Sequence, residues 1–290
     1  MNGVGILFST CNRYRPVAEW TESLIDRTWA DHPPLRRWGL GDERDWMTVT
    51  RDGVAAMQRE GFRWIYLILD DHPPVGPCRA EALNQTLPAL AEKLQAVNIS
   101  LLGWGQRRGR EGTPLGRENS FLLRNDRGYR WKFSLHPALW SVEKFLELLD
   151  IRISQFEPPA RTPWNFERHL DAPDGPVGED LLNGTYRVDG NTLAAGSHLK
   201  DALVREPLLF AFDMWRFFIR ILRGQERRDA FDRDHLWLYH YYRGPYPILW
   251  SGAVRAGKPS RDFENFLRFT GRRNLAHEWR AVREKFASAC

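Results

Sequence analysis

The first half of the chain alternates between two hydrophobic patterns. Short runs of consecutive apolar residues predict buried strands, and between them apolar residues recur three or four positions apart, as Trp20 and Leu24 do, which is typical of one helix face. The predicted strands cover residues 3–9, 34–42, 62–69 and 98–104, and the predicted helices cover residues 15–29, 45–61 and 77–97. Strands that alternate with helices predict an α/β fold, with a mainly parallel sheet covered on both faces.

The alternation stops after about residue 104. The patterns that follow predict a hairpin of two short strands, 119–126 and 128–135, and then a helix over 141–153. A short helix in a proline-rich segment is predicted over 157–170, and loops over 171–200. Two further helices are predicted at 205–224 and 273–287. Without a repeat or a clear linker, we expect residues 1–170 to form a core that continues into a helical and loop region, 171–290.

Composition narrows the choice of partners. The chain has 290 residues, of which 42% are apolar, enough for a sizeable core. A net charge of +5 favours an anionic ligand or a membrane surface. Most of the positive charge is arginine, which suits phosphate binding, although codon bias would give the same composition.

Cysteine use and hydropathy bear on the compartment. Cys11, Cys78 and Cys290 show neither disulfide nor metal spacing, which fits a reducing environment. The first residues do not resemble a signal peptide, and no segment has the roughly 18 apolar residues that a membrane span needs. We therefore expect a cytoplasmic protein whose only membrane contact would be peripheral, at the inner face.

The stretch "WIYLILDDHPP", residues 64–74, ends an apolar strand in Asp70, Asp71 and His72. Ligands bind at the carboxyl ends of strands in open parallel sheets. Paired carboxylates there favour Mg²⁺ or Mn²⁺, which also accept phosphate as a co-ligand. Asp70 and His72 alternate onto one side of an extended strand, so His72 is a third candidate ligand for Mn²⁺. The alternative is a solvated strand end in which Asp71 caps a turn before Pro73.

Four segments in order along the chain carry a resemblance to a known family. They are "ILFSTCNRY" (6–14), "LILDDHPP" (67–74), "FSLHPALW" (133–140) and "TPWNFE" (162–167). Together they resemble the nucleotide-sugar glycosyltransferases of the GT-A fold, in particular those of bacterial surface-polysaccharide assembly. The resemblance covers roughly residues 1–170 and the segment "YPILWSGAVRAGKP" near 246–259, whereas 171–240 match no known pattern. It implies a GT-A-like (Rossmann-like) mixed, mainly parallel sheet with flanking helices and a helical C-terminal region.

The resemblance implies a metal-dependent glycosyltransferase that moves a sugar from a nucleoside-diphosphate sugar to a glycan or lipid-linked acceptor, as in capsule or O-antigen synthesis. We expect inversion at the sugar, with retention as the alternative, because the same fold supports both. Asp70, Asp71 and His72 would hold Mn²⁺ or Mg²⁺, which neutralises the departing diphosphate as a Lewis acid. The implied nucleotide-sugar contacts are Thr10, Asn12, Arg13, Asp42, Asp70, Arg255 and Lys258. For the loop after the first strand, ordinary turn residues and a solvated Arg13 are the alternative.

Glu167 is the candidate catalytic base. The resemblance places it where a carboxylate takes the proton of the acceptor hydroxyl, and His136, Trp140 and Trp164 would contact the acceptor or the donor sugar. The alternative for Glu167 is a helix cap shared with Thr162. The resembling family has a polar amide in place of His136, so a core histidine is an equal alternative there.

Three features leave alternatives open. The basic run at 106–111 fits a solvated loop or an anion contact, and helix 208–224 fits either a core helix or an amphipathic helix on an anionic lipid surface. A basic, aromatic-rich module that binds glycan or single-stranded nucleic acid is a competing function, but it does not explain the acid pair. A nucleotidyltransferase is another, but it usually needs a glycine-rich phosphate loop that is not present after the first strand. We expect no nucleic-acid partner.

Overall fold

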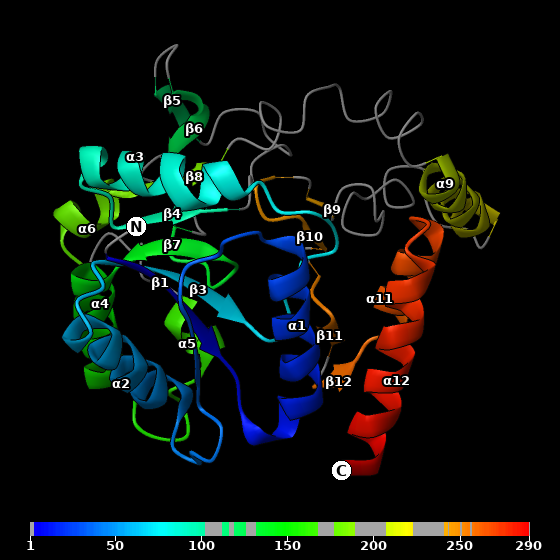
Figure 1. Ribbon diagram of the computed structural model, residues 1–290, viewed down its shortest axis with the longest axis horizontal. Helices are drawn as coiled ribbons and strands as arrows, with labels where there is room; N and C mark the ends of the chain where they lie inside the picture. The colour runs from blue at the N-terminus through cyan, green and yellow to red at the C-terminus, as the bar shows by residue number, and fades with distance from the viewer. Residues whose placement is uncertain are drawn as a thin grey trace.

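The computed structural model describes residues 3–101, 112–115, 119–125, 132–167, 177–188, 207–222, 241–242, 244–249, 251–255 and 257–289. Within these residues, eight strands form one sheet in the order β2-β1-β3-β7-β4-β8-β6-β5, with helices on both faces (Figure 1). The predicted α/β class is confirmed: the sheet is mixed, most of its strands run in one direction, and the architecture is Rossmann-like.

The strands are β1 (Val4–Ser9), β2 (Leu35–Trp38), β3 (Trp64–Leu69), β4 (Asn98–Ser100), β5 (Gly112–Leu115), β6 (Asn119–Asn125), β7 (Ala138–Ser141) and β8 (Thr185–Val188). Strands β2, β1 and β3 are parallel neighbours, and Ser9 at the end of β1 pairs with Leu69 at the end of β3. Strand β7 runs antiparallel between β3 and β4. The carboxyl ends of β1 and β3 therefore lie side by side.

The helices of the core are α1 (Arg15–Thr28), α2 (Trp46–Arg59), α3 (Leu87–Leu94), α4 (Val142–Gln155), α5 (Pro163–Glu167) and α6 (Glu179–Asn183). Local chemistry sets their ends. Asp45 caps α2 by accepting a hydrogen bond from the Thr48 amide, 2.9 Å away, and Gly61 follows α2 at a φ of 88°. A π-helical turn, Ala82–Thr86, leads into α3, and Pro88 sits in the first turn, where its missing N–H costs little.

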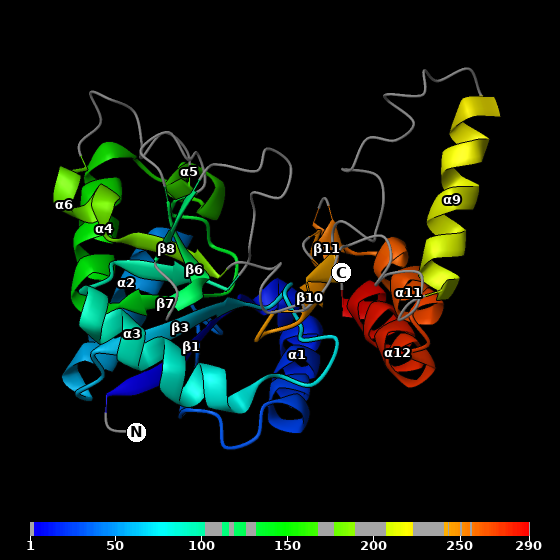
Figure 2. The same cartoon turned by 90° about the horizontal axis from the view of Figure 1, so that it is seen from above.

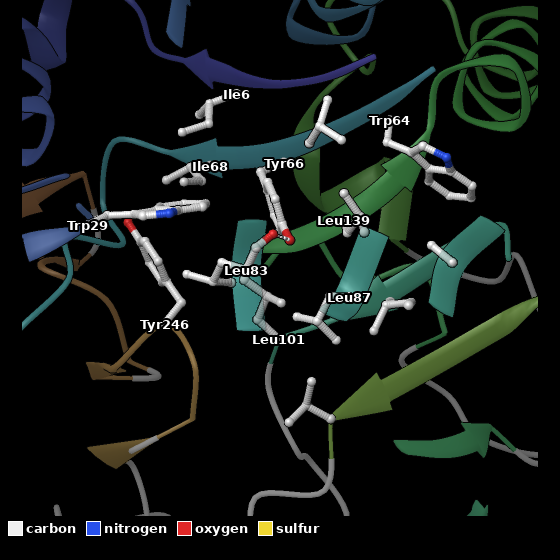
Figure 3. Packing of buried hydrophobic residues seen from close by; sticks show 14 of the residues in the cluster. Ile6, Trp29, Trp64, Tyr66, Ile68, Leu83, Leu87, Leu101, Leu139 and Tyr246 are labelled. Carbon is white, nitrogen blue, oxygen red and sulfur yellow. Dashed lines mark hydrogen bonds between the residues drawn. The ribbon is translucent and has the colours of Figure 1, made fainter. Parts of the chain in front are cut away.

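Alternate residues of the central strands pack into opposite cores. Ile6 of β1 and Tyr66 of β3 face the layer that contains α1 and α3, whereas Leu7 and Leu67 face α2 and α4. Figure 3 shows the first core, in which Trp29 lies close to both Tyr66 and a tyrosine from far along the chain, Tyr246. Burial on both faces explains why these strands are continuous apolar runs.

The C-terminal region packs against α1. It contains α9 (Pro207–Leu222), α11 (Arg261–Phe269) and α12 (Arg273–Ala289), and two small hairpins, β9 (Tyr241–Tyr242) with β10 (Ile248–Leu249) and β11 (Val254–Arg255) with β12 (Lys258–Pro259). Trp20 of α1 contacts Trp279 of α12, with ring centroids 5.1 Å apart. Figure 2 shows α11 and α12 beside α1. Among the described helices none is long and apolar enough to cross a membrane.

Three expectations need correction or fall outside the described residues. The hairpin of 119–126 with 128–135 is wrong, because β6 pairs with β5 on one side and β8 on the other, and residues 132–135 contain no strand. The loops expected over 171–200 contain α6 and the central strand β8. The basic run at 106–111 and the end of the strand expected over 98–104 lie outside the described residues.

Candidate active site

Asp70 is held at the carboxyl edge of the sheet by two threonines. Thr10 follows β1 and donates a hydrogen bond from its hydroxyl to Asp70 Oδ2, 2.7 Å away. Thr21 of α1 donates its hydroxyl hydrogen to the Asp70 backbone oxygen at 2.8 Å. Both hydrogen bonds are buried, so the position of Asp70 is fixed by the loop after β1 and by α1.

Opposing effects act on the pKa of Asp70. Burial, with a smaller contribution from the charge of Asp71, raises the pKa of Asp70 to about 8, and the Thr10 hydrogen bond opposes this shift. A carboxyl group with this pKa is protonated at neutral pH unless a cation approaches it. Binding of a positive ion at Asp70 would therefore be coupled to loss of a proton.

Asp71 and His72 form an ion pair. Asp71 Oδ1 lies 2.7 Å from His72 Nδ1. Burial alone would raise the pKa of Asp71, but the charge and hydrogen bonding of His72 lower it below the ordinary carboxyl value. Burial lowers the pKa of His72, and the neighbouring Asp71 raises it by more. Each partner therefore favours the charged form of the other, directly beside Asp70.

A second polar chain reaches the same place from the later segments. Ser134 Oγ lies 2.5 Å from His136 Nδ1 and donates to Glu167 Oε1 at 3.2 Å. Since a hydroxyl has one proton, donation to Glu167 assigns the hydrogen between Ser134 and His136 to the imidazole Nδ1. The His136 ring lies edge-on to that of His72, with centroids 4.9 Å apart. The residues of the "FSLHPALW" and "TPWNFE" segments are thus brought to the acids of the "LILDDHPP" segment.

Glu167 ends α5, and its carboxylate is turned to the loop before β7. Glu167 Oε1 accepts a hydrogen bond from the Leu135 amide at 2.6 Å. Burial raises the pKa of Glu167, and the hydrogen bonds from Leu135 and Ser134 partly offset that rise. Thr162 supplies the cap of α5, since its hydroxyl oxygen accepts from the Asn165 amide at 3.3 Å. The cap and the candidate base are therefore different residues.

The segment near 246–259 lies along the acidic loop. The Ala253 amide donates to the Asp71 backbone oxygen at 2.7 Å, and the Tyr246 hydroxyl donates to the His72 backbone oxygen at 3.2 Å. A Cβ at Gly252, which has a φ of +70°, would lie 3.1 Å from the Asp71 backbone oxygen. Glycine at this position allows the C-terminal segment to approach the acid pair closely.

Two basic residues extend from that segment. Arg255 and Lys258 are exposed on the β11–β12 hairpin, where Arg255 pairs with Asp262 at 3.2 Å. Arg13, in the loop after β1, lies beside the same hairpin, because a Cβ at Gly257 would come 3.4 Å from its guanidinium group. The fold thus gathers exposed arginine and lysine side chains from both ends of the chain.

The other predicted donor contacts have partners within the protein. Asn12 Oδ1 accepts a hydrogen bond from the Gly41 amide at 2.8 Å and so ties the loop after β1 to the loop after β2. Asp42 pairs with Arg44 at 2.6 Å, and this hydrogen bonding lowers the pKa of Asp42. Asn12 has a structural role in holding the two loops, and a ligand at Asp42 would meet the Arg44 guanidinium as well.

The predicted sugar contacts separate into a core residue and a surface residue. Trp140 is fully buried in β7 and stacks on Phe145 of α4, with centroids 4.5 Å apart. The prediction that Trp140 contacts a sugar is therefore wrong, because alternation along β7 turns this side chain into the core under α4. Trp164, on the same short helix as Glu167, is 71% exposed and stays a candidate. His136 is partly buried and belongs to the polar chain described above.

The described residues contain no group of three or more His, Cys, Asp or Glu side chains arranged to hold a metal ion. Asp70 and Asp71 still provide two adjacent carboxylates, and Asp71 Oδ1 is buried without a hydrogen bond of good geometry, even though His72 is close. Mg²⁺ is commonly bound through one or two carboxylates, with substrate phosphates and water completing its coordination. The residues present fit an ion that arrives with a phosphate-bearing ligand.

Sequence patterns gave no signal for two of the contacts. Ser134 joins Glu167 to His136, and Tyr246 fixes the backbone of the acidic loop, but neither has a spacing that predicts those partners. Both contacts depend on how distant segments pack.

The chain matches no protein-family model, and no curated protein matches it at a significant level of similarity.

Proposed function

We propose that this protein is a metal-dependent glycosyltransferase of the GT-A type, which transfers a sugar from a nucleoside-diphosphate sugar to a glycan or lipid-linked acceptor in surface-polysaccharide synthesis, with inversion at the sugar. One observation carries the proposal: Asp70, Asp71 and Glu167 come from distant segments and meet around the His72–His136 pair. A paired acid at a strand end and a separate buried carboxylate are the two groups that such a transfer needs.

The acid pair would receive the metal. Asp70 and Asp71 would hold Mn²⁺ or Mg²⁺, which supplies Lewis-acid neutralisation of the diphosphate leaving group. Thr10 keeps one Asp70 oxygen in a fixed direction, and the Ala253 amide fixes the backbone of Asp71. At neutral pH Asp70 would lose its proton on binding a cation, because burial raises its pKa to about 8.

The exposed basic residues would bind the donor phosphates. Arg13 and Lys258 come from opposite ends of the chain to the β11–β12 hairpin, and Arg255 extends from its first strand. Arginine and lysine at the carboxyl edge of the sheet favour an anionic ligand beside the acid pair. Asn12 supports this arrangement indirectly by holding the loop that carries Arg13.

Glu167 would act as the base. Its carboxylate takes the proton of the acceptor hydroxyl while the acceptor oxygen bonds to the anomeric carbon and the bond from that carbon to the diphosphate oxygen breaks. A carboxylate whose pKa is raised by burial is a stronger base than an exposed one, and Ser134 and Leu135 hold it in place. Trp164, exposed on the same helix, offers an indole face to a sugar ring.

A thermal-shift screen tests the proposal directly. The protein is heated with each common nucleoside diphosphate, with and without Mn²⁺, and with nucleotide sugars. A ligand that binds only the folded state raises its melting temperature, and a concentration of about 100 Kd adds about 2.7 kcal/mol to the free energy of unfolding. We expect at least one nucleoside diphosphate to stabilise the protein only when Mn²⁺ is present.

The same ligand then identifies the reaction. Release of nucleoside diphosphate from the matching nucleotide sugar, with the sugar found on an acceptor, supports glycosyl transfer. Release of pyrophosphate from a nucleoside triphosphate and a sugar phosphate would instead identify a nucleotidyltransferase. No stabilisation by any nucleoside diphosphate in Mn²⁺ would remove the basis of the proposal.

A further inference from the structure

Helix α9 exposes a continuous apolar stripe. Leu208, Trp215, Phe218 and Leu222 are 60%, 57%, 59% and 81% exposed, respectively. They are separated by seven, three and four residues, which places them on one side of the helix. Among the described residues, the only other large hydrophobic side chain that is similarly exposed is Trp164. This stripe, called the α9 stripe below, is too concentrated to be ordinary surface variation.

The side of α9 next to the stripe attaches the helix to the protein, because Phe212 lies beside Trp215, with ring centroids 5.6 Å apart. Phe212 stacks on Phe269 of α11, with ring centroids 3.9 Å apart, and Asp213, the single acid in α9, is buried. The helix therefore buries its carboxylate and Phe212 against the protein and leaves the four residues of the α9 stripe exposed. Its orientation is fixed by the Phe212–Phe269 contact, so the α9 stripe stays on the outside while α11 remains in place.

The position of α9 in the molecule leaves the stripe accessible to a broad surface. Figures 1 and 2 both place α9 at the outer edge of the C-terminal region, on the far side of α11 and α12 from the sheet. The helix has 16 residues, fewer than the roughly 20 needed to span a bilayer. A helix of this length with an apolar side lies along a surface rather than across it.

The charge beside the stripe is positive. Arg216 lies over the Phe212 ring at 5.7 Å, and Arg268 is exposed on α11 next to the stacked Phe269. With Asp213 buried, the described exposed residues of α9 carry no negative charge. Apolar Trp, Phe and Leu beside arginine is the composition of helices that lie in the interface of anionic membranes.

We propose that α9 docks the protein on the surface of an anionic lipid bilayer, with the α9 stripe in the acyl–headgroup boundary and the exposed Arg268 of α11 at the lipid phosphates. Trp215 and Phe218 are the main apolar anchors because they have the largest side chains in the stripe. The inference goes beyond the proposed function and does not depend on it, since docking requires neither a nucleotide sugar nor a metal ion.

Vesicle co-sedimentation with the full-length protein tests the docking surface. The vesicles contain phosphatidylcholine with phosphatidylglycerol, or phosphatidylcholine alone, at low and high salt, without nucleotide. We expect binding to the anionic vesicles that weakens with salt, as screened charges require. The double variant Trp215→Ser, Phe218→Ser should lower the partition coefficient by about tenfold or more, because each side chain loses its apolar transfer energy.

Trp164→Ser is the matched control, since it removes an exposed tryptophan from another helix and should leave vesicle binding unchanged. Circular dichroism confirms that each variant is folded. Failure of the folded wild-type protein to bind anionic vesicles at low salt would overturn the proposal, and so would equal binding by the double variant. Sedimentation velocity tests whether the stripe is instead an interface between two copies of the chain. A dimeric wild type and a monomeric double variant would show such an interface and would also overturn lipid docking.

Discussion

The hydroxyl of Thr10 donates a hydrogen bond to Asp70 Oδ2 across 2.7 Å and so joins the ends of β1 and β3 at the candidate site. The contact follows from the parallel register, in which the last residues of these strands, Ser9 and Leu69, are partners. The next residue of each strand therefore lies at the same edge. Thr10 therefore holds the carboxylate of Asp70 in position through its hydroxyl group.

Thr10→Val and Thr21→Val form a matched pair of variants. Each removes one buried hydrogen bond to Asp70, but Thr10 binds the carboxylate and Thr21 binds the backbone oxygen. Both should lower the free energy of unfolding by about 1–3 kcal/mol, measured by chemical denaturation. Only Thr10→Val should weaken Mn²⁺-dependent nucleotide binding, by about threefold to tenfold, the equivalent of one hydrogen bond. Equal affinities for the two variants would show that the Thr10 contact is purely structural.

The stability of the metal-free protein should fall as pH rises from about 4 to about 8. Burial raises the pKa of Asp70 to about 8, above the ordinary value of about 3.9. Across this window the folded state holds a proton that the unfolded state has lost, so raising the pH favours unfolding, by up to about 1.4 kcal/mol per pH unit. The raised pKa values of His72 and Glu167 act in the same direction.

Asp70→Asn removes this titration. Urea denaturation in the presence of a chelator, at pH values across the window, should give a shallower fall for Asp70→Asn than for the wild type. Glu60→Gln, at the end of α2 beside the start of β2, is a control that should follow the wild-type profile. Parallel profiles for wild type and Asp70→Asn would mean that Asp70 is ionised in the folded protein.

Glu167→Gln should retain donor binding and lose transfer. General-base catalysis typically contributes about 10²–10⁴-fold, so single-turnover rates should fall by a factor in that range. Calorimetry with the donor should give an unchanged affinity. Glu157→Gln changes an exposed acid in the segment that leads into α5 and serves as the control. Near-normal turnover in Glu167→Gln would show that Glu167 is not the base and that its role is structural, through its hydrogen bond with the Leu135 amide.

A pH profile separates the base from a purely structural carboxylate. Because burial raises the pKa of Glu167, the acid limb of kcat/KM should lie above the ordinary glutamate value of about 4.3. The hydrogen bond from Ser134 lowers this pKa, so Ser134→Ala should move the acid limb to higher pH. If the acid limb does not move in Ser134→Ala, the hydrogen bond from Ser134 does not affect the ionisation that controls kcat/KM.

Trp140 and Trp164 should respond to substitution in opposite ways. Trp140→Ala removes a fully buried ring that stacks on Phe145 and should cost about 3–5 kcal/mol of the free energy of unfolding. Trp164→Ala should leave thermal stability within about 0.5 kcal/mol, because the ring is mostly exposed, and should raise KM for the acceptor. An unchanged acceptor KM would remove Trp164 from the sugar-binding surface.

The parts of the fold that sequence patterns predicted are those with a strong local period. β1 and β3 are apolar on both faces, and α1, α2 and α4 have a clear helical spacing with end signals such as Asp45 and Gly61. β7 and β8 escaped prediction because neither is a continuous apolar run: β7 ends in Ser141, and β8 contains Thr185 and Arg187. Arg187 is buried and paired with Asn125, contrary to the usual exposure of arginine.

The candidate site divides in the same way. Asp70 and Asp71 could be placed at the edge of the sheet because a strand signal ends directly before them. Which face Trp140 occupies could not be predicted, because it depends on the antiparallel placement of β7 between β3 and β4. The link from Glu167 through Ser134 to His136 depends on how α5 packs against the loop before β7, a contact that no local pattern encodes.

The most direct test of the central claim is a calorimetric titration that compares the wild type with Asp71→Asn. The titrant is the nucleoside diphosphate that gives the largest thermal shift, added with and without Mn²⁺, and Glu60→Gln is the control carboxylate away from the carboxyl edge of the sheet. We predict Mn²⁺-dependent binding by the wild type and the control, and loss of the Mn²⁺-dependent affinity in a folded Asp71→Asn protein. Equal Mn²⁺-dependent affinities for wild type and Asp71→Asn, or binding by the wild type that ignores Mn²⁺, would contradict this prediction.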